Sequence, residues 1–290
     1  MPRVAVVSDS TGYLPGELAR SKGIHLVPLY VNFGEEQSVP EDRMPDFDSF
    51  YDDLRSPDEL PTTSHPTVAD FLEVYEPLLD EGSDVISVHI SGGLSSTVEV
   101  AREAVRRLEA DRPAGQVGVH VLDSSTAGGG LGLMALAAAH RGRVATSAQE
   151  VADAVSAARL ELKTWVALDT LEFLKRSDRA GAAKSWIGST LGIKPILTVE
   201  REIQPVERVR TSERMAERLV DYARQRAESG ASAWFVQHVQ APEQAAQLVD
   251  ACAEVFQRGP EFVSEVGPVL GVHTGPRMLA MGAVPPHHLE

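Results

Sequence analysis

The first half of the chain alternates short apolar runs with longer segments of helical periodicity. Residues 4–10, 84–90 and 117–122 are apolar runs of strand length, while residues 67–81 and 95–110 carry apolar side chains at helical spacing. Strands separated by helices form βαβ units, so this alternation predicts a parallel sheet. Ligands bind such sheets beyond the carboxyl ends of the strands, so a site is expected there.

The length of the chain and a change in its pattern of strands and helices predict two domains. A length of 290 residues suggests two domains, at about 100–200 residues each. Because the pattern changes near residue 160, we expect an α/β domain over residues 1–159 and a mixed α/β domain over residues 160–284. Further strands are expected at 24–33, 165–168, 196–199, 203–209, 233–239 and 262–272, and further helices at 47–54, 126–140, 148–162, 171–175, 180–191, 212–227 and 242–256.

Charge and composition restrict the class of partner. The formal net charge of -15 repels phosphate backbones and disfavours nucleic acid. Between residues 159 and 214, eleven basic residues outnumber eight acidic ones, so this segment could present a basic patch to an acidic partner or form an ordinary solvated surface. The lone cysteine, Cys252, excludes an internal disulfide. With no signal peptide and no apolar run of 18 residues, the sequence predicts a cytoplasmic protein without membrane spans.

Hydroxyl side chains gather at the expected strand ends, above all at residues 91–97. This stretch follows a strand and opens a helix, and helix N-termini present unpaired N–H groups that suit an anion. The hydroxyls could donate to a carboxylate or phosphate, or Ser95 or Ser96 could simply cap the helix. Residues 62–66 offer a second set of hydroxyls, with ordinary capping again as the alternative.

No catalytic motif stands out. The sequence contains neither a G-x-S-x-G nucleophile elbow nor an H-E-x-x-H zinc motif, and the histidines lack metal-ligand spacing. The glycines at 128–130 and 132 are wrongly spaced for a dinucleotide fingerprint, and favour tight helix–sheet packing or room for an apolar ligand. His273, expected at the end of a strand, could be structural, or could donate to an anion or carry a proton.

Seven short segments, in this order, resemble the DegV family. Each is weak alone, but together they span nearly the whole chain. They are residues 7–11, 63–67, 90–97, 121–124, 192–197, 209–211 and 267–276.

The resemblance implies a two-domain α/β fold, with an N-terminal three-layer α/β/α domain containing a parallel sheet and a C-terminal domain containing a mixed sheet. It implies one long-chain fatty acid, such as palmitate, stearate or oleate, bound between the domains. The protein would catalyse nothing itself and need no metal or cofactor. It would present the acyl carboxylate to a separate fatty acid kinase for phospholipid synthesis. We expect a monomer, since no coiled-coil pattern is present.

The resemblance also implies roles for particular residues. Thr63, Ser95 and His273 are expected at the carboxylate, and Arg210 at the contact with the kinase. We expect the hydroxyls to hold the carboxylate without a countercharge. Further candidates at the head group are Ser64, Ser91, Ser96, Thr274 and Arg277.

Three positions depart from the family pattern. His65 stands where the family usually has glutamine, Gly92-Gly93 where it has Ser-Gly, and Arg277 where it has glycine. The Gly92 departure removes a hydroxyl, and Arg277 could add a positive charge near the carboxylate or point to solvent. Two rival functions remain open: a lipid-sensing regulatory module, and a hydrolase-like or kinase-like enzyme that uses the serine-rich loops.

Overall fold

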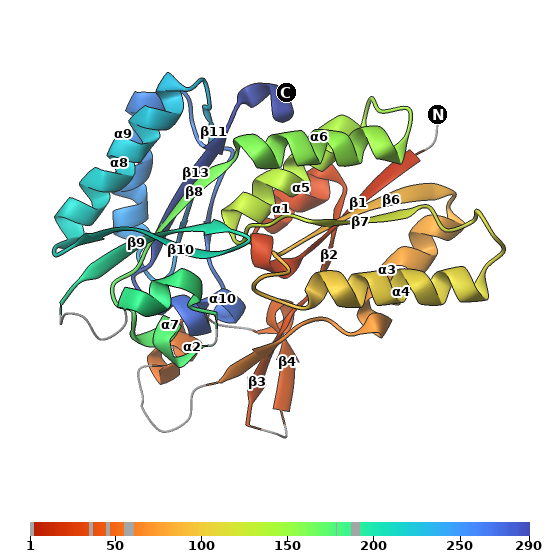
Figure 1. Ribbon diagram of the computed structural model, residues 1–290, viewed down its shortest axis with the longest axis horizontal. Helices are drawn as coiled ribbons and strands as arrows, with labels where there is room; N and C mark the ends of the chain where they lie inside the picture. Colours follow the sequence, from red (N-terminus) through yellow and green to blue (C-terminus); the bar gives the residue numbers. More distant parts are fainter. Residues whose placement is uncertain (1–2, 35–36, 45–46, 55–60, 178, 187–191) are drawn as a thin grey trace.

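The fold is built around two large sheets (Figure 1). The computed structural model describes residues 3–34, 37–44, 47–54, 61–177, 179–186 and 192–290. Within them, no helix is both long enough and apolar enough to cross a bilayer. The predicted α/β architecture, with a parallel sheet in the first half and a mixed sheet in the second, is confirmed.

The first sheet is four-stranded and wholly parallel, in the order β2-β1-β6-β7. Helices α3 and α4 pack on one face and α5 and α6 on the other, which makes three layers (Figure 1). Helices therefore cover both faces of the sheet and shield them from water. This explains why the residues of its strands are apolar almost without interruption. Its elements are β1 (Arg3–Asp9), α1 (Gly16–Lys22), β2 (Ile24–Val27), α3 (Val68–Asp80), β6 (Ser83–His89), α4 (Thr97–Asp111), β7 (Val119–Asp123), α5 (Gly129–Gly142) and α6 (Ala148–Glu161).

A small antiparallel sheet, in the order β4-β3-β5, projects beside the first sheet (Figure 1). The prediction of one strand over residues 24–33 is wrong, because two strands occupy this range. The first ends at Val27 in the parallel sheet, and the second begins at Tyr30 in the small antiparallel sheet. Pro28 lies between the two pieces and has no N–H to continue the ladder. The segment comprises β3 (Tyr30–Phe33), β4 (Gln37–Pro40), the 3-10 turn η2 (Glu41–Arg43), α2 (Phe47–Leu54) and β5 (Thr62–Ser64).

The third sheet has six strands, in the order β10-β9-β8-β13-β11-β12, and only β11 and β12 pair in parallel. Helices α8 and α9 cover its outer face, where Trp165 and Tyr222 stack with ring centroids 4.6 Å apart and Cys252 is fully buried (Figure 1). Its elements are β8 (Lys163–Ala167), α7 (Glu172–Arg176), β9 (Lys194–Glu200), β10 (Glu202–Val209), α8 (Ser212–Glu228), β11 (Ala233–His238), α9 (Pro242–Phe256), β12 (Phe262–Glu265), α10 (Pro268–Thr274) and β13 (Leu279–Val284).

The expected strand over residues 262–272 is wrong beyond Glu265. Gly267 and Pro268 begin helix α10, so His273 lies in the last turn of a helix. A short apolar run cannot distinguish strand from buried helix by periodicity alone, which explains the error. Strand β13 was not expected at all, although it is central to the sheet. In place of the helix expected over 180–191 there is a 3-10 turn, η3 (Gly181–Trp186), and residues 187–191 lie outside the described part.

Helix α5 lies between the two large sheets and contacts strands of both (Figure 1). Residues 129–139 of this helix are all buried. Its glycines permit close contact, as expected: a Cβ added to Gly129 would lie 2.2 Å from two ring carbons of Phe235. Gly129 N–H also donates to the side-chain oxygen of Gln237 at 2.5 Å. The packing of α5 thus joins the first half of the chain to the inner face of the third sheet.

Gly129→Ala should destabilise the protein by on the order of 1–2 kcal/mol through overpacking against Phe235. This sign is the reverse of the usual one, because alanine is normally about 1 kcal/mol better than glycine within a helix. Gly142→Ala, at the other end of α5, is a matched control, since its added Cβ would meet its nearest atom at 3.7 Å. Urea unfolding of both variants checks this, and a stabilised Gly129→Ala would contradict the packing described.

Candidate functional site

A cavity of about 480 Å³ lies between the inner face of the third sheet and the loops at the carboxyl ends of the parallel strands. Its size falls in the range of small-molecule sites, roughly 300–1,000 Å³. Strands β8, β9, β11 and β13 supply one wall, and α10 supplies another. The loops after the parallel strands β6 and β7 supply further lining, as expected for a parallel sheet. Strand β5 of the small antiparallel sheet, helix α7 and Arg179 contribute as well.

The wall formed by the third sheet is largely apolar. Its side chains face the first half of the chain because alternate residues of each strand point to opposite faces, and the other face is covered by α8 and α9. Such a wall suits a hydrocarbon ligand. The side chains include Val166, Leu197, Val199, Phe235 and Ala280.

At the polar end of the cavity, two side chains from different segments converge on the imidazole of His273. His273 Nε2 lies 3.0 Å from Thr63 Oγ1 and 3.3 Å from Arg179 Nη1. Because arginine can only donate, His273 Nε2 accepts and the ring proton resides on Nδ1. Arg179 Nε also donates to the Leu94 carbonyl at 2.8 Å, which fixes the guanidinium beside the cavity.

His273 is neutral in this setting. Burial, with a smaller effect from the nearby positive charge of Arg179, lowers its pKa to about 4. Its Nδ1 is buried and has no hydrogen-bond partner among the described residues. Arg179 therefore supplies the positive charge at this end of the cavity, while His273 and Thr63 supply polar atoms around it.

Ser95 and Ser96 line the cavity where helix α4 begins. Ser95 Oγ accepts from the Thr97 N–H at 3.3 Å and lies 2.8 Å from Thr97 Oγ1. Ser96 occupies the N-cap position but makes no side-chain cap bond. Ser95 thus serves the helix terminus and faces the cavity as well, so the two interpretations of this loop are compatible.

Of the other residues expected near the head group, some line the cavity and others lie outside it. Ser64, His65 and Thr274 line the cavity, although Thr274 donates to the Leu270 carbonyl at 3.1 Å. Ser91 is fully buried and donates to the carbonyl of Arg201 at 2.6 Å, which ties this loop to the β9–β10 turn.

Arg277 does not line this cavity. Its side chain is 69% exposed and pairs with Asp169 at 2.7 Å, so it cannot add charge at the polar end. Arg210 is exposed at the end of β10, next to Thr211, which caps α8.

Sequence reasoning missed Arg179, which lines the cavity beside His273 and brings a positive charge that the expected head-group residues did not include. The residue belongs to the basic segment 159–214, but that segment contains ten other basic residues. Only the fold distinguishes Arg179, because it places α7 and the following turn beside α10. No spacing within the sequence carries that information.

Three hydrogen-bonded side chains that resemble a catalytic triad lie in the first sheet, next to helix α3. Ser87 Oγ is 2.6 Å from His89 Nε2, and His89 Nδ1 is 3.1 Å from Asp9 Oδ2. All three residues are fully buried, and Tyr75 Oη lies 2.7 Å from Ser87 Oγ. None of them lines the cavity, so Ser87 has no route to a substrate there and the network is structural.

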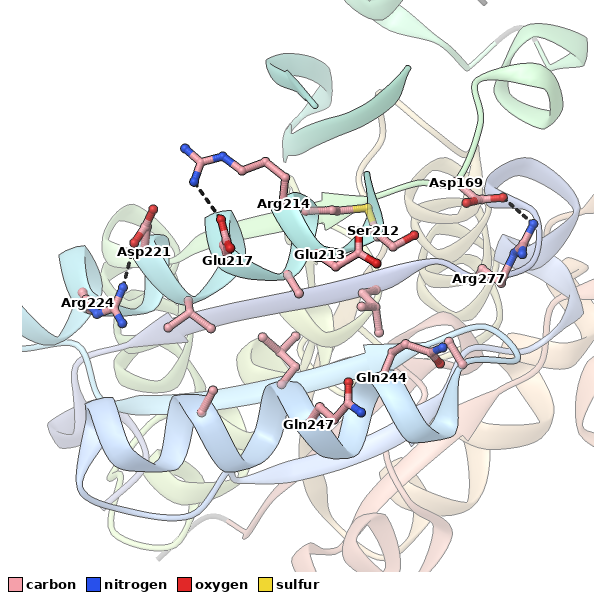
Figure 2. Close-up of a pocket in the computed structure, with 17 residues that line it drawn as sticks. Asp169, Ser212, Glu213, Arg214, Glu217, Asp221, Arg224, Gln244, Gln247 and Arg277 are labelled. Atoms are coloured by element: carbon pink, nitrogen blue, oxygen red, sulfur yellow. Dashed lines mark hydrogen bonds and ion pairs between the residues drawn. The ribbon is translucent and has the colours of Figure 1, made fainter. Parts of the chain in front are cut away.

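A second hollow, of about 670 Å³, lies on the outer face of the third sheet between α8 and α9 (Figure 2). Most of its charged side chains form ion pairs, among them Arg214 with Glu217 at 2.8 Å and Arg224 with Asp221 at 2.7 Å. Gln244 and Gln247 face them from α9 (Figure 2). Paired surface charges of this kind contribute little binding energy, so the inner cavity is the stronger candidate.

Known proteins resemble this chain over nearly its whole length. A family model described as "Uncharacterised protein, DegV family" matches residues 3–286. A DegV domain-containing protein of Streptomyces coelicolor is 35% identical over 281 residues, 96% of this chain and 97% of that protein. A solved DegV family protein from Thermus thermophilus, described by its fatty acid binding, is 30% identical with a TM-score of 0.88, over 98% of this chain and 99% of the other. The solved DegV of Bacillus subtilis, described as a fatty acid binding protein, is 30% identical with a TM-score of 0.86, over 98% and 100%.

Proposed function

The chain belongs to the DegV family, and on that premise we propose that it is a cytoplasmic, non-catalytic protein that binds one long-chain fatty acid, such as palmitate, stearate or oleate. The observation that carries the proposal is a cavity with an apolar wall and a polar end where Thr63, Arg179 and His273 converge. The fatty acid binding described for the Thermus and Bacillus relatives supports it.

The two ends of the cavity match the two ends of such a ligand. Each methylene removed from water contributes about 0.8 kcal/mol, less the costs of ordering and association. A carboxylate is costly to bury unless it is hydrogen-bonded and neutralised, which Arg179 and the Thr63 hydroxyl can do. We place the ligand between a domain of residues 1–159, which supplies Thr63 and Ser95, and a domain of residues 160–284, which supplies Arg179 and His273.

Thr63→Ala combined with Ser95→Ala should weaken fatty acid binding about 30-fold, because each of the two lost hydroxyl–carboxylate bonds contributes on the order of 1 kcal/mol. Native mass spectrometry of the purified protein, followed by lipid extraction and titration with oleate, measures this. Thr146→Ala with Ser156→Ala is the matched control, since neither residue lines the cavity. A wild-type protein that carries no lipid and takes up neither palmitate nor oleate would refute the proposal.

We further propose that the bound carboxylate is presented to a separate fatty acid kinase, with Arg210 at the contact surface. The exposure of Arg210 at the end of β10 is compatible with such a contact. Incubating the loaded protein with a purified fatty acid kinase and ATP should produce acyl phosphate. Absence of product would favour the lipid-sensing alternative, in which the bound acid is a signal.

A further inference from the structure

Helix α10 belongs to the second half of the chain, but its first turn is held by side chains from the first half. The amides at the start of a helix have no partner within the helix. Here the Val269 N–H donates to Glu41 Oε1 at 2.7 Å, and the Leu270 N–H donates to Tyr13 Oη at 3.1 Å. Tyr51 Oη donates to the Val266 carbonyl at 2.8 Å, just before the helix.

Glu41 is the centre of this attachment. It is 3% exposed, and its carboxylate accepts from Tyr13 Oη at 2.8 Å and from Ser10 Oγ at 3.1 Å, as well as from Val269. A buried carboxylate is costly to retain, and a charge that accepts bonds from a helix terminus and two hydroxyls recovers part of that cost. The described contacts of Glu41 place it at the joint between the two halves and outside the cavity itself.

The fit at this joint leaves little room for α10 to move. A Cβ added to Gly267 would lie 2.5 Å from Glu41 Oε1, and one added to Gly271 would lie 2.0 Å from Tyr51 Oη. The opposite end of the same short helix carries His273, which meets Thr63 and Arg179. A seven-residue helix is only about 10 Å long and behaves as a rigid rod, so a shift at its start reaches His273.

We infer that Glu41 is a positioning residue for the head-group end of the cavity: by fixing the first turn of α10, it sets the place of His273 against Thr63 and Arg179. The inference rests on the proposed fatty acid site and adds a residue that does not touch the ligand. Its consequence is that loss of Glu41 weakens recognition of the carboxylate more than recognition of the tail.

The test compares oleate with oleyl alcohol, which has the same tail but no carboxylate. Kd values for both ligands are measured at pH 8 with wild type, Glu41→Ala and Glu41→Gln. We expect Glu41→Ala to lower the preference for oleate over oleyl alcohol by about tenfold, and Glu41→Gln to restore most of it, because its side-chain oxygen can still accept from Val269. Tyr75→Phe removes a buried hydroxyl that bonds Ser87 and does not line the cavity, so it should leave the preference unchanged.

An unchanged preference in Glu41→Ala, or an equal loss of affinity for both ligands, would overturn the inference while wild-type binding of oleate upholds the proposed function. A wild type that binds neither ligand would overturn both. If Glu41→Ala does not fold, Tyr13→Phe poses the same question by removing the hydroxyl that serves Leu270. A Tyr13→Phe variant with the wild-type preference would then count against the inference.

Discussion

Replacing Arg179 by glutamine should lower the affinity for oleate by about 100-fold. Losing one partner of a buried, hydrogen-bonded charge pair typically costs about 2–5 kcal/mol, and the half-buried Arg179 falls toward the lower end of that range. The guanidinium lies 3.3 Å from His273 Nε2 and donates to the Leu94 carbonyl, so it is held beside the place where a carboxylate would enter. Glutamine keeps a polar side chain but supplies no charge. Displacement of a fluorescent fatty acid measures the change.

Arg277→Gln is the matched control for this variant. Both substitutions remove one positive charge, but Arg277 is exposed and pairs with Asp169 away from the cavity (Figure 2). Its Kd for oleate should equal that of wild type. Equal losses in the two variants would mean that overall charge, rather than the placement of Arg179, governs binding. An unaffected Arg179→Gln would remove this residue from the head-group site.

Glu41 should make the protein less stable at alkaline than at acidic pH. The pKa of Glu41 is raised to about 7, because burial, with a smaller effect from the carboxylate of Asp9, outweighs the hydrogen bonds from Val269, Tyr13 and Ser10 that lower it. A carboxyl whose pKa is higher in the folded state contributes stability that is complete below its unfolded pKa, about 4.5, and is lost as pH rises through 7. At 1.36 kcal/mol per pKa unit, the loss between pH 5 and pH 8 is roughly 2–3 kcal/mol.

Comparison with Glu41→Gln isolates this contribution. His273 has the opposite effect, because its pKa is lowered to about 4 and its contribution is lost as pH falls from about 6.5 to 4. Tyr13 and Tyr51 also face Glu41, but burial keeps their pKa values well above 10 and they do not titrate in this range. These contributions are common to both proteins and cancel in the difference. Urea unfolding at pH 5, 6, 7 and 8 should show the gap between wild type and Glu41→Gln changing by that amount; parallel curves would contradict it.

The parallel part of the fold could be predicted because its elements carry local signals. Strand β6 and helices α3 and α4 differ clearly in periodicity, and Thr67 and Asp70 form a capping box that marks where α3 begins. Strands were also expected where β9 and β10 lie; they pair antiparallel, and Arg201 between them has a φ of 65°. Such features depend on a few neighbouring residues, which a sequence displays.

What could not be predicted depends on contacts between distant residues. Strand β13 reads Leu-Ala-Met-Gly-Ala-Val, which is weak as a strand by composition, yet it is buried throughout because β8 and β11 enclose it. Glu41 lies in an acidic stretch that suggests a solvated loop, and only tertiary packing buries it. In the candidate site, the hydroxyl-rich loop at Ser95 could be predicted because it lies between a strand and a helix. Arg179 could not be predicted, because it is 94 residues from His273 in the sequence and local patterns do not reveal contacts over that separation.

The order of strands in the third sheet constrains how the protein can form during synthesis. Strand β13 follows every other strand of this sheet in sequence, yet it pairs between β8 and β11. Until it has left the ribosome, β8 and β11 each lack a neighbour, and their apolar edges are open to unwanted pairing. The strands of the first sheet can pair much earlier in synthesis. Until β11 and β13 have been made, however, the face of α5 that packs against them stays exposed. Strand β13, which follows the other strands of this sheet in the sequence, therefore completes both the sheet and the wall of the cavity.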